Sequence, residues 1–244
     1  MSLEAAQAGW SRSGAEPTVD SAVGPSPSTR AASTSLILIR HGVTDWNRAH
    51  RFQGHIDIPL NDEGRRQAAA VARRFAASPD RERIAAIHVS DLSRAVQTAA
   101  PIAEALGLPL QRDPSLRERH YGGFEGRTHE ELERDEPDAW RRWRARDPDF
   151  VPPGGGESLR GFHTRVEGAL RALARRHPSR IVIAVAHGGV LDCAYRIAAG
   201  LPMQAPRGHS LLNASLNRIS FDGSRFALVD WADVTHLDEA LDDA

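Results

Sequence analysis

Three apolar runs in the sequence end in side chains that can perform chemistry. The runs span residues 36–40, 85–90 and 181–187, and each has the composition of a buried β-strand. They deliver Arg40 and His41 after the first run, Arg94 after the second, and His187 at the end of the third. In an open α/β sheet, ligands bind beyond the carboxyl ends of the parallel strands. We therefore expect two imidazoles and two guanidinium groups to meet at one site.

An anion fits this set of groups better than a metal ion does. Planar guanidinium groups bind phosphate oxygens with paired hydrogen bonds, and Gly188 and Gly189 expose backbone N–H groups at the start of a helix. Arginine is a poor neighbour for a cation, and no carboxylate or third histidine stands at a spacing typical of zinc sites, such as HExxH. We therefore expect a phosphate-binding site and no metal.

The composition narrows the classes of protein further. All 31 basic residues are arginine, which excludes a Schiff-base lysine and a GxxxxGK[ST] phosphate loop. The formal net charge of −1 gives no sign of a nucleic-acid or membrane partner. The single cysteine, Cys193, lies in an apolar helical run and is expected to be a buried, inert thiol. Because the sequence shows no secretory signal or membrane span, we expect a cytoplasmic protein.

The elements that position these groups alternate between strands and amphipathic helices, which predicts an α/β domain with a largely parallel sheet. Besides the three apolar runs, a short strand is expected at 109–113 and an edge hairpin at 215–221 and 225–231. Helical periodicity follows Gly64 and Ser158. A third helix, residues 93–106, contains Pro101, where we expect a kink or a break.

Two parts of the chain differ from this alternating pattern. Residues 1–34 are rich in Ala, Ser, Pro and Gly, so we expect a disordered N-terminal tail ahead of one domain at 35–244. Residues 115–156 are polar, rich in Arg, Glu and Trp, and run into a Pro- and Gly-rich stretch. We interpret them as a partly helical lid inserted between core elements.

The segment RHGVTDWN, residues 40–47, resembles the RHGxTxxN signature of the histidine phosphatase superfamily, also called the phosphoglycerate mutase-like family. Further segments resemble the family's motifs in the same order: RFQGHIDIPLNDEG (51–64), SDLSRAVQTA (90–99), LRERHYGGFEG (116–126), PGGGES (153–158) and AHGG (186–189). The resemblance implies a three-layer sandwich with a mostly parallel central sheet, helices on both faces and a lid excursion.

The resemblance also implies roles for individual residues. His41 would be the nucleophile that forms a phosphohistidine. The groups implied to bind the transferring phosphoryl group are Arg40, Asn47, Arg94, His187 and Gly188. Glu118, in the LRE segment, would protonate the leaving alkoxide and then activate water. No metal is implied.

The same pocket can transfer the phosphoryl group to water or to a second hydroxyl, and the motifs point both ways. Arg119 and Tyr121 resemble the residues that bind phosphoglycerate in mutases, and the arginine pair at 141–142 resembles one that mutases place on the glycerate carboxylate. Gln53, a candidate substrate ligand, and His129 resemble the phosphatases, because mutases carry threonine and lysine at those places.

We therefore favour a metal-independent phosphomonoester hydrolase that acts on a small phosphorylated metabolite. The alternative is a phosphoglycerate mutase that needs 2,3-bisphosphoglycerate as a primer. A third interpretation is a catalytically silent module that binds phosphorylated ligands. The sequence leaves the substrate open, and it does not distinguish a monomer from a homodimer.

Overall fold

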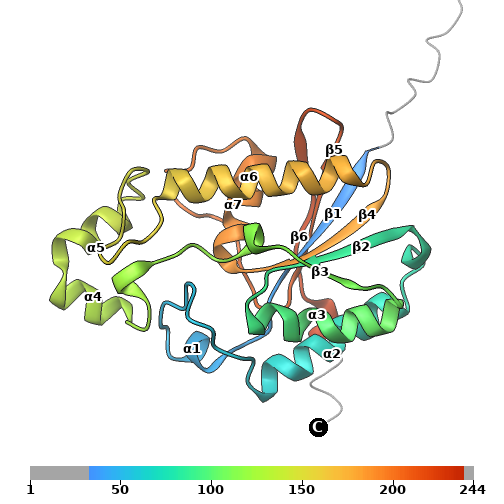
Figure 1. Cartoon of the computed structure of the whole chain (residues 1–244), viewed down its shortest axis with the longest axis horizontal. Coiled ribbons are helices and arrows are strands. Elements are labelled where there is room, and N and C mark those ends of the chain that lie inside the picture. The colour runs from blue at the N-terminus through green and yellow to red at the C-terminus, as the bar shows by residue number, and fades with distance from the viewer. Residues whose placement is uncertain (1–32, 239–244) are drawn as a thin grey trace, which may run out of the picture. The chain divides into compact units, whose positions relative to one another are not determined.

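A six-stranded sheet forms the centre of the computed structural model, which describes residues 33–238 (Figure 1). The strands are β1 (Thr34–Arg40), β2 (Ile84–Val89), β3 (Leu110–Arg112), β4 (Ile181–Ala186), β5 (Leu216–Phe221) and β6 (Phe226–Asp233). Their order across the sheet is β3-β2-β4-β1-β5-β6. The first four pair in parallel, whereas β5 is antiparallel to both β1 and β6. The expected largely parallel sheet with an edge hairpin is confirmed.

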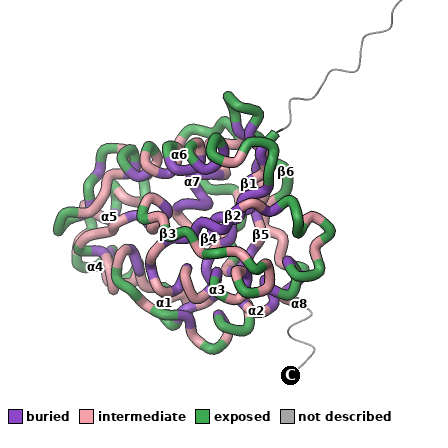
Figure 2. The backbone as a smooth tube through the Cα atoms, turned by 45° about the vertical axis from the view of Figure 1, so that its right-hand side comes forward, coloured by how far each residue is buried: buried purple, intermediate pink, exposed green. Residues whose placement is uncertain are grey.

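Helices cover both faces of the sheet because the central strands are apolar on both sides. In β1, Leu36 and Leu38 pack toward α6 (Leu159–Arg176) and α7 (Gly188–Ala199). Ile37 and Ile39 point the other way, toward α2 (Asp62–Ala76) and α3 (Ser93–Leu106). Figure 2 shows the buried residues gathered along the strands. The expected three-layer arrangement is thus confirmed, and each buried Leu or Ile contributes about 1.5–3 kcal/mol to it.

Side-chain caps begin the two longest helices where the sequence pattern placed them. The Asn61 side chain accepts from Gly64 N at the start of α2, and Ser158 accepts from Gly161 N at the start of α6, both at 3.0 Å. Of the kink or break expected at Pro101, the break is absent, since α3 runs through this residue as one helix. A proline removes only one backbone donor, and the buried apolar face of α3 outweighs that loss.

The segment between β3 and α6 has a small core of its own. It contains the turns Pro114–Leu116 and Gly122–Phe124 and the helices α4 (His129–Asp135) and α5 (Pro137–Arg144). Its buried side chains form a separate cluster of Phe124, Leu132, Trp140 and Phe150. In Figure 1, α4 and α5 lie to one side of the layered body, away from the strands.

The remaining elements are the start of the described chain and a few short helical segments. The expected disordered tail at 1–34 lies outside the described residues except for its last two, and of these Thr34 is buried and opens β1. Two short helices complete the structure, α1 (Asp45–Arg48) after β1 and α8 (Thr235–Asp238) after β6, together with the turn Arg81–Arg83 before β2.

Candidate active site

β1 carries the first two candidate residues to the carboxyl edge of the sheet. Arg40 ends the strand, and the backbone N–H of His41 donates to Ala186 O on β4 at 2.9 Å, which extends the pairing of the two strands. Gly42 allows α2 to approach closely, because a Cβ at this position would lie 2.6 Å from Gly64 O. The backbone of His41 is therefore fixed on both sides.

The ring of His41 is buried and has one nitrogen lone pair available. Nδ1 lies 2.7 Å from Gly42 O, and because a carbonyl only accepts, Nδ1 carries the proton. Burial first, and then the positive charges of Arg94 and Arg40, lower the pKa of His41 well below its usual value of 6.5. The imidazole is therefore neutral near neutral pH, with Nε2 free to act as a nucleophile.

Arg94 and His187 contact each other beside His41. The guanidinium of Arg94, in the first turn of α3, donates from Nε to His187 Nδ1 at 3.3 Å. Its other two nitrogens donate to Gly54 O at 2.7 Å and to Ile56 O at 3.0 Å. The rings of His41 and His187 have centroids 5.2 Å apart. Two neighbouring strand ends and one helix start thus bring these three side chains together.

His187 is also neutral in the folded protein. Burial lowers its pKa well below 6.5, and the nearby charge of Arg94 adds to this effect. Because Nδ1 accepts from Arg94, the proton lies on Nε2, which is 2.7 Å from Ser90 Oγ at the end of β2. The tautomer of His187 is therefore set by its two neighbours.

Arg40 presents a buried donor that has no partner among the described residues. Its Nη1 donates to Leu211 O, whereas its Nε is buried and unpaired. Gly188 lies against this side of the guanidinium, and a Cβ at this position would lie 3.4 Å from Nε. An unpaired buried donor on a cation is costly, so this edge of Arg40 suits an anionic ligand.

A cavity of about 140 Å³ opens over these groups. It is lined by Arg40, His41, Asn47, Arg51, Phe52, Gln53, Gly54, Arg94, Glu118 and Tyr121. Seven of the predicted site residues are in this set, whereas Arg119, His187 and Gly188 are not. His187 and Gly188 instead contact the arginines that line it.

Asn47 and Gln53 add neutral polar groups to the cavity. The Asn47 oxygen Oδ1 accepts from both Thr44 N and Thr44 Oγ1 at 3.0 Å, which caps α1 and leaves the Nδ2 donor for the cavity. The amide oxygen of Gln53 is buried with no hydrogen-bond partner among residues 33–238. Each amide can donate an N–H group to an anion.

A larger cavity of about 690 Å³ lies elsewhere in the structure. Ile37, Ile84 and Ile181 line it, so it lies toward the amino ends of the parallel strands. None of the predicted site residues belongs to its wall. Because ligands of open α/β sheets bind at the carboxyl ends, we assign the candidate active site to the smaller cavity.

Among the described residues, Glu118 is the only one that contributes a carboxylate to the wall of this cavity. Its Oε1 accepts from Arg119 N at 2.8 Å, and its Oε2 accepts from Gly189 N at 3.0 Å in the first turn of α7. A Cβ at Gly189 would lie 2.2 Å from Glu118 Oε1, so only glycine allows this close contact. The carboxyl group is thus held in a fixed orientation beside two arginines and the His41 ring.

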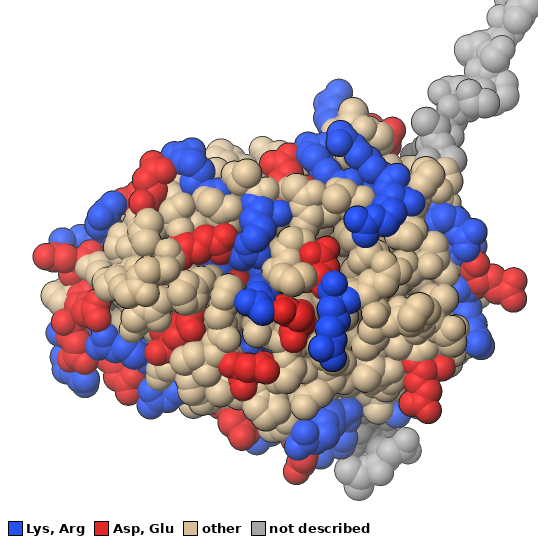
Figure 3. All heavy atoms as spheres, in the orientation of Figure 1, with Lys and Arg blue, Asp and Glu red and all other residues tan. Residues whose placement is uncertain are grey.

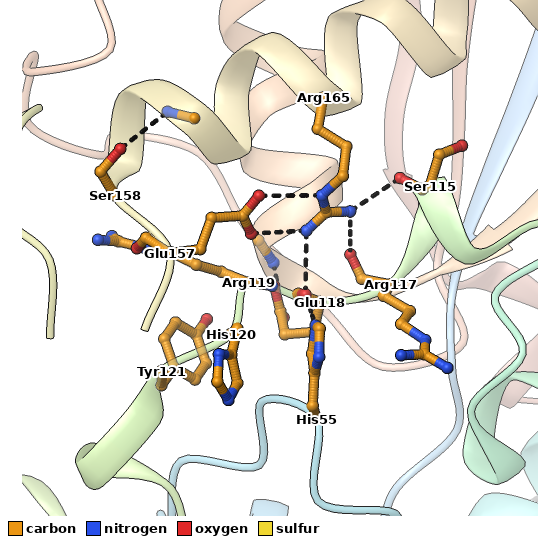
Figure 4. A network of polar contacts seen from close by, with 12 residues as sticks. His55, Ser115, Arg117, Glu118, Arg119, His120, Tyr121, Glu157, Ser158 and Arg165 are labelled. Carbon is orange, nitrogen blue, oxygen red and sulfur yellow. Dashed lines mark hydrogen bonds and ion pairs between the residues drawn. The ribbon is translucent and has the colours of Figure 1, made fainter. Parts of the chain in front are cut away.

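Arg119 and Tyr121, the two mutase-like residues, lie in different places. Arg119 donates from Nε to Glu157 O at 2.8 Å and from Nη2 to Phe150 O at 3.2 Å, and its guanidinium lies 4.5 Å from the centre of a Trp143 ring. Tyr121 lines the cavity. Figure 4 shows both residues with Glu118 on the segment after β3.

The remaining residues weighed for mutase activity are exposed on the outer helices. His129 begins α4 and is exposed. On α5, Arg141 pairs with Asp138 at 3.0 Å and Arg142 pairs with Asp147 at 2.7 Å. None of these residues lines the cavity.

Asn213, which the sequence pattern did not single out, supports the catalytic strand from the loop before β5. Its Nδ2 donates to His41 O at 2.8 Å, and the next residue, Ala214, donates from its backbone N to Arg40 O at 2.9 Å. A lone asparagine in a loop carries no local signal. Only the antiparallel pairing of β5 with β1 brings it to the site.

Charges of both signs share the face of the molecule that Figure 3 presents, where arginines are interleaved with acidic side chains. Within residues 33–238, no three or more His, Cys, Asp or Glu side chains are grouped so that they could hold a metal ion. No helix in that range is long and apolar enough to cross a membrane.

Comparisons with known proteins agree with this geometry. A family model of the histidine phosphatase superfamily (branch 1) matches residues 36–234. The chain is 39% identical to a metal-independent phosphoserine phosphatase of Arabidopsis thaliana, over 84% of this chain and 83% of the relative. It is 37% identical to phosphoglycerate mutase-like protein 4 of the same plant, over 84% and 87% of the two chains.

A solved structure with the same fold is that of a mycobacterial glucosyl-3-phosphoglycerate phosphatase in complex with VO3. It is 34% identical and aligns with a TM-score of 0.69, over 81% of this chain and 98% of that one. The range matched by the family model includes the strand ends, the helix starts and Glu118. The chain therefore belongs to the histidine phosphatase superfamily, branch 1.

Proposed function

We propose that this chain hydrolyses small phosphomonoesters in two displacement steps at His41, without a metal ion. The observation that carries the proposal is the neutral, buried His41 ring, whose free Nε2 belongs to a cavity walled by Arg40 and Arg94. A nucleophile beside two fixed cations, with one carboxyl group nearby, is an arrangement suited to phosphoryl transfer.

In the first step, the Nε2 lone pair attacks phosphorus and the bond from phosphorus to the ester oxygen breaks. The leaving oxygen takes a proton from the Glu118 carboxyl group and departs as an alcohol. In the second step, Glu118 accepts a proton from water while the water oxygen attacks phosphorus. The bond from phosphorus to nitrogen breaks, its electron pair returns to His41, and inorganic phosphate is released.

The role of the remaining residues is to hold the phosphoryl oxygens. Arg40 and Arg94 neutralise their charge, while Asn47 and Gln53 supply neutral donors. His187 and Gly188 contact Arg94 and Arg40 and keep these guanidinium groups in place. Donors that are already in position stabilise the transition state by about 3–4 kcal/mol each, because they need no reorganisation during the reaction.

A phosphoglycerate mutase activity is the second candidate, because Tyr121 lines the cavity and one relative is named mutase-like. It would require 2,3-bisphosphoglycerate to load His41 before turnover. Two observations favour hydrolysis. Arg119 uses two of its donor nitrogens on backbone carbonyls, and the arginines of α5 pair with acids at the surface.

The substrates named for the relatives suggest the substrate class. One relative is a phosphoserine phosphatase and another acts on glucosyl-3-phosphoglycerate, both small phosphorylated compounds. We propose that the segment 115–156 acts as the lid that selects among such esters, within the domain at 35–244. We also propose a cytoplasmic location, because a single buried cysteine suits a reducing compartment.

Release of inorganic phosphate from a panel of phosphomonoesters tests the proposal. The panel includes phosphoserine and 3-phosphoglycerate, excess EDTA is present, and His41→Ala is the control. Release that persists in EDTA and is lost in the variant supports metal-free hydrolysis at His41. If the parent releases no phosphate but converts 3-phosphoglycerate to 2-phosphoglycerate when primed, the mutase is correct. Binding of phosphorylated ligands without either reaction would identify a silent binding module.

A further inference from the structure

The segment that carries Glu118 is held by side chains and not by the sheet. Residues 115–118 begin within the turn Pro114–Leu116 after β3 and form no ladder with any strand of the described residues. Figure 4 shows Arg165 of α6 reaching toward this backbone. Its Nη1 donates to Ser115 O at 2.9 Å and to Arg117 O at 3.0 Å, and its Nη2 donates to Glu118 O at 3.2 Å. One guanidinium thus binds three carbonyl groups within four residues.

Glu157 fixes the orientation of that guanidinium. Its Oε1 accepts from Arg165 Nε at 3.0 Å and its Oε2 accepts from Arg165 Nη2 at 2.7 Å, which is the paired geometry that orients a guanidinium most firmly. The backbone of Glu157 is also tied to the same segment, since its N donates to His120 O at 2.8 Å and its O accepts from Arg119 Nε. Both side chains are about three-quarters buried.

The bound backbone sets the position of the Glu118 carboxyl group. The carboxyl group itself is oriented by Arg119 N and Gly189 N, and the first of these belongs to the bound segment. On the other side, His55 Nε2 lies 2.9 Å from Glu118 O. A shift of this backbone therefore moves the carboxyl group relative to His41, which is anchored separately on β1.

We propose that Arg165, fixed by Glu157, is a positioning residue that places the Glu118 carboxyl group at the leaving-group oxygen. This inference rests on the proposed role of Glu118 as proton donor. Arg165 does not line the cavity, and among the residues to which it is hydrogen-bonded only Glu118 does, so we expect its effect on the reaction to pass through Glu118. A displacement of about 1 Å in a reacting group lowers a rate by about 100-fold, so a small backbone shift is enough.

The test compares kcat/KM for an alkyl phosphate with kcat/KM for p-nitrophenyl phosphate. For each ester, kcat/KM reports the steps up to departure of the leaving group. The alkoxide needs a proton to leave, whereas p-nitrophenolate does not. We expect Arg165→Met to lower kcat/KM about 10- to 100-fold for the alkyl ester and less than about threefold for the nitrophenyl ester. Arg165→Lys and Glu157→Gln, which retain part of the contact, are expected to give intermediate losses for the alkyl ester.

Arg171→Met is the matched control. Arg171 lies on the same helix, pairs with Glu167 at 2.8 Å and donates to Ser224 O at 2.9 Å, at similar exposure but away from the cavity. We expect this variant to keep the parent kcat/KM for both esters. Thermal unfolding of all variants identifies a loss of folded protein, in which case Arg165→Lys and Glu157→Gln carry the test.

A double variant separates this inference from the proposed function. If Arg165 acts through Glu118, adding Arg165→Met to Glu118→Gln causes no further loss for the alkyl ester. Losses that multiply, or equal losses for both esters in Arg165→Met, would overturn the positioning role while leaving Glu118 as donor. If Glu118→Gln alone keeps the parent activity on the alkyl ester, Glu118 is not the donor and the positioning role falls with it.

Discussion

The two halves of the candidate active site are held in place by different means. His41 and Arg40 end a central strand that is paired on both sides, and His187 ends the strand next to it. Glu118 instead lies on a segment held by the side chains of Arg165 and Glu157. Strand pairing resists small changes of sequence, whereas one substitution can remove a side-chain anchor. The position of the proposed nucleophile therefore depends on backbone pairing, and that of the proposed proton donor depends on side-chain contacts.

The strongest test of this difference removes the nucleophile. We expect His41→Ala to lower kcat/KM for every ester by a factor on the order of 10⁴ or more. Among the described residues, no other histidine lines the cavity, so no second imidazole could replace the nucleophile. His88→Gln is the matched control, since His88 is a buried histidine on β2 of the same sheet and lies outside the cavity. Equal losses in the two variants would show that the effect comes from folding.

The next test removes the proton donor and depends on the leaving group. We expect Glu118→Gln to lower kcat/KM by about 10²–10⁴-fold for an alkyl phosphate and far less for p-nitrophenyl phosphate. The amide keeps the shape of the side chain but cannot transfer the proton. A loss of the same size for both esters would instead assign Glu118 to substrate binding.

Two neighbouring glycines allow the Arg40 side and the Glu118 side of the site to be perturbed separately. A methyl group at Gly189 would lie 2.2 Å from Glu118 Oε1, whereas one at Gly188 would lie 3.4 Å from Arg40 Nε. We expect Gly189→Ala to lower kcat/KM for alkyl esters about 10- to 100-fold by displacing the carboxyl group. Gly188→Ala is expected to lower kcat/KM for the same esters only a few-fold. Steady-state kinetics of the pair, with circular dichroism to check folding, measures the difference, and the reverse order would contradict it.

The smallest expected effect concerns pH and stability. Burial, followed by the charge of His177, lowers the pKa of His88 from 6.5 to about 4. The unfolded chain therefore binds a proton before the folded chain does, and the free energy of unfolding falls as the pH drops from about 7 toward 4. His41 and His187, also of lowered pKa, act in the same direction.

Urea unfolding at about pH 7 and about pH 5 measures this dependence. We expect His88→Gln to lose less stability than the parent between the two values, because one proton-linked group is gone. A variant with the same slope as the parent would show that His88 is protonated equally in both states.

The strand half of the site was predictable from the sequence, and the side-chain half was not. A continuous apolar run that ends in a histidine indicates both a buried strand and a residue at its edge, which places His41 and His187 without further information. Arg165 looks like any arginine on an amphipathic helix, and Asn213 like any loop residue. Their contacts join residues far apart in the sequence, and no local pattern records such pairs.

Pro101 and Arg119 show the limits of local rules in another way. A proline within a helical pattern predicts a kink or a break, and the apolar face of α3 keeps this helix unbroken. Arg119 resembles a substrate-binding residue by its place in the motif, yet Trp143 and two carbonyls of the neighbouring segment hold its guanidinium. In both cases the packing of distant residues decides the outcome.

The place of β1 in the sheet has a consequence for how the enzyme is made. β1 is the first strand of the chain, but its two neighbours, β4 and β5, come late in the sequence. During synthesis, β1 with Arg40 and His41 therefore emerges early from the ribosome. It does not have both of its neighbouring strands until nearly the whole domain has been synthesised. Contacts of such long sequence separation also slow folding. A truncated nascent chain that ends before β5 would contain every residue of the proposed chemistry, but β1 would be paired on one side only, by β4.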